Sequence, residues 1–385
     1  MNKVYADNGS TSFPKAPGVS DAIKNFLDNN GTNINRGGYA SSFDVALEVL
    51  ETRKLLCRLF KFQEPRNVVF TPGITYSLNM LLHGFLEEGD HVITSAMEHN
   101  SVMRPLNMLL GYGVTLDVAH CRADGNLDPN EIRNRINKKT KAVVMTHASN
   151  VCGTVLPLEE VYEICEKNGV KLILDTAQTA GIIDINMAYV HALAFTCHKG
   201  LMAAQGLGGF ILRNDTADDI KPIFTGGTGS KSHEITQPNF LPDKFESGTL
   251  NLPAIIGLKT SLEYILSEGI RAINEKEVKL TECFLSEMRE CDEVEIIGVK
   301  GIRGRTGVVS LNFPGKDNAE IAAALDRDYG IMARCGLHCA PAAHKTLGTY
   351  PHGTVRFSFG YFNTLDEIGY IARAIRQLIK HDNAF

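Results

Sequence analysis

Short apolar runs rich in β-branched residues alternate with segments whose apolar residues recur at helical spacing, and this alternation is the strongest constraint on the fold. The runs include NVVF at 67–70, HVIT, KAVVMTH, VKLILD and ALAFT, and the helical segments between them include TYSLNMLLHGFL, SVMRPLNMLL and LEEVYEICEKNG. Near-continuous apolar strands alternating with helices predict a largely parallel sheet covered on both faces, an α/β fold. GGFIL follows ALAFT closely and is predicted to run in the opposite direction.

The regular alternation of short apolar runs and helical segments ends after Pro253, which predicts a second and smaller unit. One long helical pattern spans 258–289, and the strands VEIIG, VVSLNF and VRFSF then alternate with the helix NAEIAAALDRDYG and a closing helix over 365–380. Mixed strands and helices of this kind predict a smaller C-terminal α+β domain. We predict a large domain over 15–255 and a small domain formed by 1–14 together with 256–385. A long polar loop, 226–243, precedes the boundary, and long loops in compact proteins are usually functional.

Composition excludes several classes of function. The 385 residues are 44% apolar and carry a formal net charge of −5, which argues against nucleic acid or an anionic membrane as a partner. No apolar run approaches the length of a membrane span, and the N-terminal residues lack the apolar core of a signal peptide, so the expected location is the cytoplasm. Nine scattered cysteines do not form a disulfide framework; most are expected to be buried, and one could be a nucleophile.

Polar side chains follow the predicted strands where each strand ends, and ligands of parallel sheets bind at that edge. A glycine and a hydroxyl open the helix after NVVF, which predicts an anion or phosphate site, with an ordinary helix cap as the alternative. A histidine, an asparagine, an aspartate and a lysine follow the next strands. Individually each also fits a structural role, such as a solvated surface lysine or a helix-capping aspartate. Their convergence is the signal, and the set is Gly73, Thr75, His99, Asn150, Asp175 and Lys199.

DTAQ followed downstream by CHK resembles the signature of class V, fold-type-I pyridoxal-phosphate enzymes. Other motifs occur in the same order along the chain as in the cysteine desulfurase and selenocysteine lyase branch: EHNS, HASNVCGTV, FESGTLN, RCGLHCA and VRFSFGYFNT. The similarity extends from YADNGSTSFP to the C-terminal helix. The resemblance implies a fold-type-I transferase with a mostly parallel seven-stranded sheet in a large, cofactor-binding domain. The small domain is implied to carry the arginine for the substrate carboxylate and a catalytic cysteine loop.

The resemblance also implies roles around the cofactor, pyridoxal 5'-phosphate. Lys199 is implied to bind the cofactor aldehyde covalently and then to carry protons, and a lysine can act as a base near neutral pH when burial and cationic neighbours lower its pKa. Asp175 is implied to pair with the ring nitrogen, Gln178 with the ring oxygen, and His99 to lie flat on the ring. The phosphate is implied to be held by Thr75, Thr196, His198 and the backbone around Gly73.

Substrate and subunit contacts are implied in the same way. Arg356 is implied to bind the substrate carboxylate, which suits a planar bidentate donor, with Asn150 assisting. Thr249 is implied to reach the phosphate of the neighbouring subunit, which means a homodimer with shared active sites. Two positions depart from the pattern: Ile74 removes one possible phosphate contact, and Cys197, where a small residue is common, is interpreted as packing.

RCGLHCAPAAH is the stretch that selects the reaction. Cys339 matches the family's persulfide-forming cysteine. The resemblance therefore implies three catalytic residues: Lys199, His99 and Cys339. Cys335 could receive sulfur, form a regulatory disulfide or have no role. A zinc site built from Cys335, His338, Cys339 and His344 is an alternative, but the spacing is not a standard zinc pattern, and we predict no metal.

The predicted function is therefore a pyridoxal-phosphate-dependent cysteine desulfurase that converts L-cysteine to L-alanine and leaves a persulfide on Cys339. Alternatives are a selenocysteine or cysteine-sulfinate lyase, a class V aminotransferase, and a non-catalytic scaffold that keeps the fold. The expected partners are L-cysteine or a related amino acid and a second copy of the chain, with a sulfur-acceptor protein as a further candidate.

Overall fold

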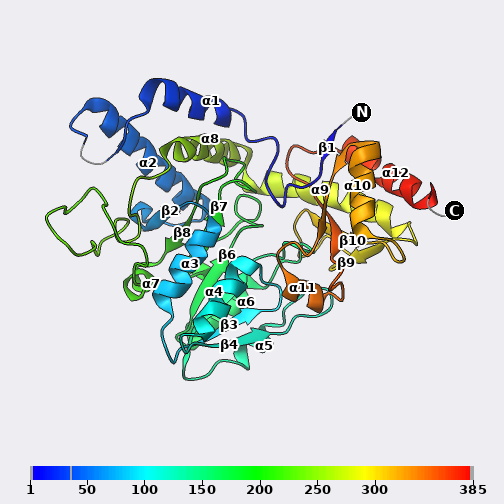
Figure 1. Cartoon of the computed structure of the whole chain (residues 1–385), viewed down its shortest axis with the longest axis horizontal. Coiled ribbons are helices and arrows are strands. Elements are labelled where there is room, and N and C mark those ends of the chain that lie inside the picture. Colours follow the sequence, from blue (N-terminus) through cyan, green and yellow to red (C-terminus); the bar gives the residue numbers. More distant parts are fainter. Residues whose placement is uncertain (1–2, 35–36, 382–385) are drawn as a thin grey trace.

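The computed structural model describes residues 3–34 and 37–381, and its largest element is a seven-stranded sheet (Figure 1). The strand order is β2-β8-β7-β6-β5-β3-β4. β8 runs antiparallel to both of its neighbours, whereas the other pairs are parallel, so the predicted mostly parallel sheet and the reversed GGFIL strand are confirmed. The strands are β2 (Val68–Thr71), β3 (His91–Ser95), β4 (Thr115–Ala119), β5 (Thr140–Thr146), β6 (Lys171–Asp175), β7 (Ala192–Thr196) and β8 (Gly208–Leu212).

Helices cover both faces of this sheet because alternate residues of each strand point to opposite sides. On one face, Val144 and Ala194 belong to an apolar cluster with residues of α3 (Ile74–Phe85) and α4 (Asn100–Leu110). On the other face, Val143 and Phe195 join a cluster with α2 (Ala40–Leu59), α6 (Leu158–Lys167) and α8 (Leu252–Glu268). Strands that are buried on both sides therefore read as continuous apolar runs.

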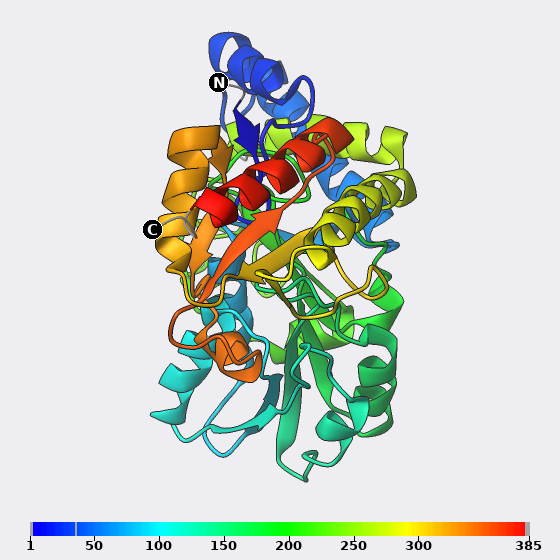
Figure 2. The ribbon, with the colours of Figure 1, turned by 90° about the vertical axis from the view of Figure 1, so that its right-hand side faces the viewer.

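A four-stranded antiparallel sheet forms the second unit, with strand order β12-β13-β10-β9. Its apolar core contains residues of α9 (Ile270–Arg289), α10 (Asn318–Tyr329) and α12 (Leu365–His381), and Figure 2 shows α12 lying over this sheet. The strands are β9 (Glu295–Ile297), β10 (Val308–Asn312), β12 (Arg334–Gly336) and β13 (Thr354–Ser358). The proposed domain boundaries at 14/15 and 255/256 stay a prediction.

Shorter elements complete the chain. The N-terminal strand β1 (Val4–Tyr5) pairs in parallel with β11 (Ile331–Met332), so the start of the chain joins the second unit. The other elements are α1 (Val19–Asn25), α5 (Pro129–Arg133), α7 (Asn214–Asp219), α11 (Pro341–Thr346), a π-helical turn at Phe26–Asn30, and 3-10 turns at Pro65–Asn67 and Met187–Tyr189. Within the described ranges, no helix is both long enough and apolar enough to cross a membrane.

The single helical pattern predicted over 258–289 is wrong. The structure has two helices, α8 and α9, which meet at Gly269. Gly269 has φ 86° and ψ 130°, a backbone conformation at positive φ that only glycine adopts without strain. α8 packs against α1 and α2, whereas α9 packs against α12, so the change of direction at Gly269 sends the chain from one unit toward the other.

Gly269→Ala is expected to destabilise the protein by about 1 kcal/mol, because a Cβ is unfavourable at a positive φ. A Cβ at Gly269 or at Gly301 would meet no atom within 4 Å, and only Gly269 has a positive φ. Gly301→Ala is thus a matched control that is expected to be neutral or slightly stabilising. Urea denaturation of both variants measures the difference, and equal stabilities would contradict the backbone argument.

Candidate active site

The carboxyl ends of β3, β5, β6 and β7 lie side by side along one edge of the large sheet. This order places His99, Asn150, Asp175 and Lys199 after successive neighbouring strands. Register confirms the proximity of two of the strand ends, because Thr146 of β5 pairs with Asp175, and the His147 N–H donates to the Asp175 carbonyl over 2.8 Å. The predicted convergence of strand ends is therefore confirmed at the level of the backbone.

Lys199 follows β7 in a turn and is partly buried. Burial lowers the pKa of Lys199 to about 8; Asp175 acts in the opposite direction, and the cationic Arg356 lowers the pKa further. Loss of hydration disfavours the charged amine more than the nearby carboxylate favours it. A substantial fraction of Lys199 is therefore a neutral amine near pH 8, which is the nucleophilic form.

Asp175 is the last residue of β6 and Gln178 lies in the turn that follows, and both side chains are buried. The Asp175 carboxylate accepts a hydrogen bond from the Ala177 N–H over 2.8 Å. Burial raises the pKa of Asp175, while that hydrogen bond and Lys199 lower it. Gln178 donates from Nε2 to the Gly9 carbonyl over 3.0 Å, so its amide is tied to the N-terminal segment.

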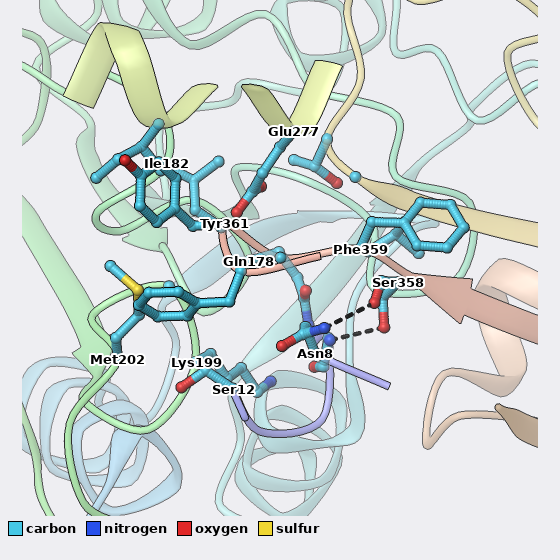
Figure 3. A pocket seen from close by; sticks show the side chains of 18 of the residues that line it. Asn8, Ser12, Gln178, Ile182, Lys199, Met202, Glu277, Ser358, Phe359 and Tyr361 are labelled. Atoms are coloured by element: carbon cyan, nitrogen blue, oxygen red, sulfur yellow. Dashed lines mark hydrogen bonds between the residues drawn. The ribbon is translucent and has the colours of Figure 1, made fainter. Parts of the chain in front are cut away.

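A small cavity of about 30 Å³ lies beside Lys199 and Gln178 (Figure 3). Asn8 and Ser358 border it, and the Asn8 side chain donates to the Ser358 carbonyl over 3.1 Å. Glu277 enters from α9, and burial raises the pKa of its carboxyl to about 8, with a hydrogen bond from the Tyr361 backbone acting in the opposite direction. The cavity beside Lys199 is therefore lined in part by polar side chains, and residues of the second unit form part of its wall.

His99 caps the N-terminus of α4. Its Nδ1 accepts from the Ser101 N–H over 3.0 Å, which uses the lone pair of that nitrogen. Burial, followed by Lys199 and two arginines, lowers the pKa of His99 to about 4. The ring is therefore neutral at physiological pH and carries its proton on Nε2.

The candidate phosphate residues occupy several environments. Gly73 caps the N-terminus of α3, and β8 approaches it so closely that a Cβ on Gly208 would lie 2.8 Å from the Gly73 backbone. Thr196 is buried at the end of β7, whereas Thr75 is exposed in the first turn of α3. His198 Nδ1 is buried without a hydrogen-bond partner among the described residues, and burial lowers the pKa of this histidine to about 4.

Thr249 lies apart from these residues in the long polar region before α8. It is exposed and lines a surface groove of about 630 Å³ that also contains Thr71, Tyr76 and Gly206. The cavity beside Lys199 does not include Thr249 within the described part of the chain. Whether this threonine serves a second subunit stays a prediction.

Arg356 lies at the centre of β13 and is 2% exposed. Its Nη1 donates to the Asn150 carbonyl over 3.0 Å, and its Nη2 donates to Asp7 Oδ1 and to Ser10 Oγ, each over 2.7 Å. Arg334, its cross-strand neighbour on β12, also donates to Ser10 Oγ over 2.7 Å. The candidate carboxylate-binding arginine is therefore already surrounded by polar partners.

The loop that carries Cys339 is held by the large sheet. Asn150 Nδ2 donates to the His338 carbonyl over 2.7 Å, and the Asn100 N–H donates to the Cys339 carbonyl over 2.8 Å. Asn100 directly follows His99, so the loop is anchored beside the candidate ring-stacking residue. His338 and Cys339 have φ values of 48° and 57°, a left-handed backbone that these surrounding contacts maintain.

A buried hydrogen-bond chain fixes the other side of this loop. Ser310 Oγ donates to the Val151 carbonyl over 2.6 Å, and Thr354 Oγ1 donates to Ser310 Oγ over 3.0 Å. Because the single hydroxyl proton of Thr354 is used on Ser310, the contact of 3.1 Å with His338 Nε2 requires that the histidine donate. His338 is therefore held in one tautomer, and its ring links the cysteine loop to β13 and β10.

Cys335 faces away from this arrangement. It pairs across the strands with Val355, a residue of the small apolar core, whereas Arg334 pairs with Arg356. Paired residues share a face and neighbours alternate, so Cys335 and Arg356 lie on opposite faces. This favours the interpretation in which Cys335 has no role at the site. In the described ranges, no group of three or more histidine, cysteine or acidic side chains could hold a metal ion.

Four residues at the site received no role from the sequence: Asp7, Ser10, Glu98 and Glu277. Glu98 is buried beside His99, and burial raises the pKa of its carboxyl to about 8, while hydrogen bonds from Ser95 and Thr146 lower it. Glu277 had a readable signal, because it occupies a buried position in the helical repeat of α9, between Ile273 and Leu280. Asp7 and Ser10 had none, since their partner is distant in the chain.

The mostly parallel sheet, with a lysine and an aspartate at the ends of adjacent strands, defines the fold-type-I class of pyridoxal-phosphate proteins. More specifically, the chain belongs to the aminotransferase class-V family, whose model matches residues 4–371. It is 30% identical to a probable cysteine desulfurase of Methanothermobacter thermautotrophicus over 97% of this chain and 94% of that protein. A probable cysteine desulfurase of Pyrococcus abyssi is also 30% identical, over 98% and 94% of the two chains.

A solved structure supports the same assignment of fold. The apo structure of the cysteine desulfurase from Thermococcus onnurineus NA1 matches with a TM-score of 0.91 and 31% identity, and covers 98% of this chain and 95% of that one. The predicted fold class and family are therefore confirmed. The roles assigned to individual site residues stay predictions.

Reaction of Lys199 with pyridoxal phosphate is expected to accelerate with pH and to level off above a midpoint near 8, because only the neutral amine is nucleophilic. An unperturbed lysine would give a midpoint near the usual value of about 10.4. Stopped-flow absorbance after mixing cofactor-free protein with pyridoxal phosphate at a series of pH values measures the profile. Lys199→Ala provides the baseline, and a midpoint near 10 would contradict the perturbed pKa.

Proposed function

We propose that this protein is a pyridoxal-phosphate-dependent cysteine desulfurase that converts L-cysteine to L-alanine and transfers the sulfur to Cys339. The observation that carries the proposal is the docking of an exposed cysteine beside the candidate cofactor residues: the Cys339 carbonyl accepts from the Asn100 N–H, and Asn100 follows His99. The cysteine desulfurases named among the relatives and structural neighbours support it.

The residues of the site fit pyridoxal phosphate. Asp175 is a buried carboxylate suited to a protonated ring nitrogen, and Lys199 is an amine with a lowered pKa. His198 Nδ1 and Arg356 Nε are buried polar atoms without partners among the described residues, suited to an anionic ligand. When bound, the cofactor supplies an electron sink that stabilises negative charge on the α-carbon of an amino acid. Gly73, Thr75, Thr196 and His198 are proposed to hold its phosphate.

The chain's own side chains then have distinct tasks. Arg356 and Asn150 are proposed to orient the substrate through its carboxylate, and neutral His99 to cover the ring without adding charge. Lys199 is proposed to take and return protons at the substrate carbons, because its pKa of about 8 is close to the working pH. Of these residues, Asn150, His99 and Lys199 belong to the set that the strand ends of the large sheet bring together, whereas Arg356 comes from β13 of the second unit.

Cys339 is proposed to remove the sulfur. Its thiolate attacks the sulfur atom of bound cysteine, a sulfur–sulfur bond forms, and the carbon–sulfur bond breaks. The electron pair of the broken bond stays on carbon, which takes up a proton and leaves as part of alanine. The persulfide that remains on Cys339 lies at an exposed position, where an acceptor can reach it.

A homodimer with shared active sites is part of the proposal. Large apolar side chains are exposed on and around α2, and Phe43, Leu47 and Leu50 are spaced by four and three residues, which places them on one face of the helix. Such a face is expected to be covered by a partner, and we propose a second copy of this chain. The exposed residues are Leu27, Tyr39, Phe43, Leu47, Leu50 and Phe224.

A sulfur-acceptor protein and a cytoplasmic location complete the proposal. All nine cysteines are free thiols, which suits a reducing compartment. A persulfide at the protein surface requires an external thiol or protein to remove it, since an unloaded Cys339 is needed for the next turnover.

Cys339→Ala is expected to reduce alanine formation from L-cysteine, in the presence of a thiol reductant, by on the order of 10²-fold or more, because the sulfur loses its nucleophile. Chromatographic detection of alanine measures the rate. Cys335→Ala, a second exposed cysteine on the same strand-and-loop segment, is the control and is expected to keep wild-type activity.

If the Cys339 variant released alanine from cysteine as fast as the wild type, the persulfide mechanism would be wrong. Comparing the activity of Cys339→Ala on selenocysteine and on cysteine tests the lyase alternative. Release of selenium, a better leaving group, is expected to need Cys339 less than release of sulfur does. Turnover of a keto acid as amino acceptor would instead favour an aminotransferase.

Co-expression of a Lys199→Ala chain with a Thr249→Asp chain is expected to restore activity that neither variant has alone. A carboxylate at 249 would repel a phosphate held by the partner, whereas a heterodimer keeps one site with both native residues. Random pairing gives about one quarter of the wild-type activity. Affinity-purified heterodimers keep one of their two sites and are expected to show about one half of the wild-type activity. Absence of recovery would place Thr249 in its own subunit's site, and wild-type activity of Thr249→Asp alone would place it outside any site.

A further inference from the structure

Lys15 places an ammonium group against the turn that carries Lys199. Its Nζ donates to Thr11 Oγ1 over 3.1 Å, to Ser12 Oγ over 3.2 Å and to the His198 carbonyl over 3.2 Å. An ammonium has three N–H donors, and these three acceptors use all of them. Burial lowers the pKa of Lys15 to about 8, and among the described residues no carboxylate offsets this effect. The cation is therefore held by neutral oxygen atoms alone.

The His198 carbonyl belongs to the peptide that directly precedes Lys199, and it receives further donors besides Lys15. The Ser12 N–H donates to it over 2.8 Å, the Thr11 hydroxyl over 3.0 Å and the Ser12 hydroxyl over 3.2 Å. Because both hydroxyl oxygens accept from Lys15, their protons are free to point at the carbonyl. Lys15 thus orients the two hydroxyl groups as well as donating itself, and connected hydrogen bonds strengthen one another.

The same N-terminal segment also holds the far end of this turn. The Ala16 N–H donates to the Met202 carbonyl over 3.0 Å, and the Met202 N–H donates to the Lys199 carbonyl over 2.8 Å. Met202 has φ 47°, a left-handed backbone that a residue other than glycine keeps only when its surroundings impose it. The carbonyls on both sides of the Lys199 α-carbon are therefore bonded, which fixes the direction in which its side chain leaves the backbone.

Lys15 lies close to the site but outside the cavity. Ser12 and Lys199 border the same cavity (Figure 3), whereas Lys15 is absent from its lining within the described ranges. After burial, the positive charges of Lys199 and Lys15 lower the pKa of His198, so Lys15 is within electrostatic reach of the turn. Its contacts are with the hydroxyl groups and the backbone that support Lys199, and a role through Lys199 follows from this placement.

We propose that Lys15 is a positioning residue for Lys199, which holds the preceding peptide so that the free Lys199 amine stays beside the α-carbon of the substrate. This inference rests on the proton-carrying role proposed for Lys199. In that role, a covalent bond to the cofactor fixes the end of the side chain at first, and only the backbone fixes it once an amino acid has taken its place. A displacement of about 1 Å in a reacting group can slow a reaction by about 10²-fold.

Lys15→Met in the cofactor-loaded protein tests this inference, because methionine is unbranched and has no N–H donor. The reaction followed is exchange of the α-hydrogen of L-alanine in D₂O, in which Lys199 takes the proton from the α-carbon, exchanges it with solvent and returns a deuteron. Proton NMR measures the rate per cofactor-loaded site. At saturating L-alanine we expect the rate to fall by about tenfold. The apparent Kd of L-alanine is expected to stay within about twofold, because the proposed carboxylate ligands Arg356 and Asn150 are unchanged.

Lys3→Met is the matched control, since Lys3 is an exposed lysine of the same N-terminal segment and its loss changes the net charge equally. It is expected to leave the exchange rate and the Kd unchanged. Thr11→Val removes one donor from the same carbonyl and is expected to slow exchange by about threefold, which keeps the inference testable if Lys15→Met does not fold. The double variant is expected to lose less than the product of the two single effects, because both act through the His198 carbonyl.

An exchange rate per loaded site that Lys15→Met left unchanged would overturn the proposal. A rise in the Kd of L-alanine as large as the fall in rate would also overturn it, since that result describes a general disturbance of the site. Effects of Lys15→Met and Thr11→Val that simply multiply would contradict a shared route through one carbonyl. Failure of the proposed function is distinguishable, because a protein that forms no alanine from cysteine still reports exchange of the alanine α-hydrogen.

Discussion

The burial of the Arg356 guanidinium is the constraint on which the arrangement of the two units depends. Arg356 is 2% exposed, and removing such a charge from water costs several kcal/mol unless it is paired and hydrogen-bonded. Its partners come from two other parts of the chain: Asp7 and Ser10 from the N-terminal segment, and the Asn150 carbonyl from the loop after β5. The strand that carries the arginine is thereby fixed against both the N-terminus and the large sheet.

The large sheet supplies the rest of the site through its topology. β3, β5, β6 and β7 are neighbours although other elements separate them in the chain, so their carboxyl ends form one row. Burial governs both charged members of that row: it lowers the pKa of Lys199 and raises the pKa of Asp175, and in each case it outweighs their mutual attraction. The protonation states of Asp175 and Lys199 are therefore sensitive to any bound polar or charged group that replaces the lost hydration, because electrostatic interactions are strong in a low-dielectric interior.

Sequence reasoning succeeded where the signal is local and periodic. The buried strands, the reversed β8 and the helix opened by Gly73 were all predicted, because apolar runs and turn residues act within a few positions. The edge strand β4 was missed, since its outer face is solvated and its residues alternate in exposure. The break at Gly269 was missed because the helical period continues across it. The contact between Asp7 and Arg356 joins residues 349 positions apart, and no sequence period records such a pair.

The contacts of the Cys339 loop also constrain how sulfur can leave the site, if Cys339 carries it. The carbonyls of His338 and Cys339 accept from Asn150 and from the start of α4, and the His338 ring is fixed to the small sheet through Thr354. A loop that swung outward would break all three bonds and leave buried polar groups unpaired, each at a cost of about 1–3 kcal/mol. Delivery by a swinging loop is therefore unfavourable. If Cys339 carries the sulfur, the favourable route is for an acceptor to approach the exposed thiol where it stands.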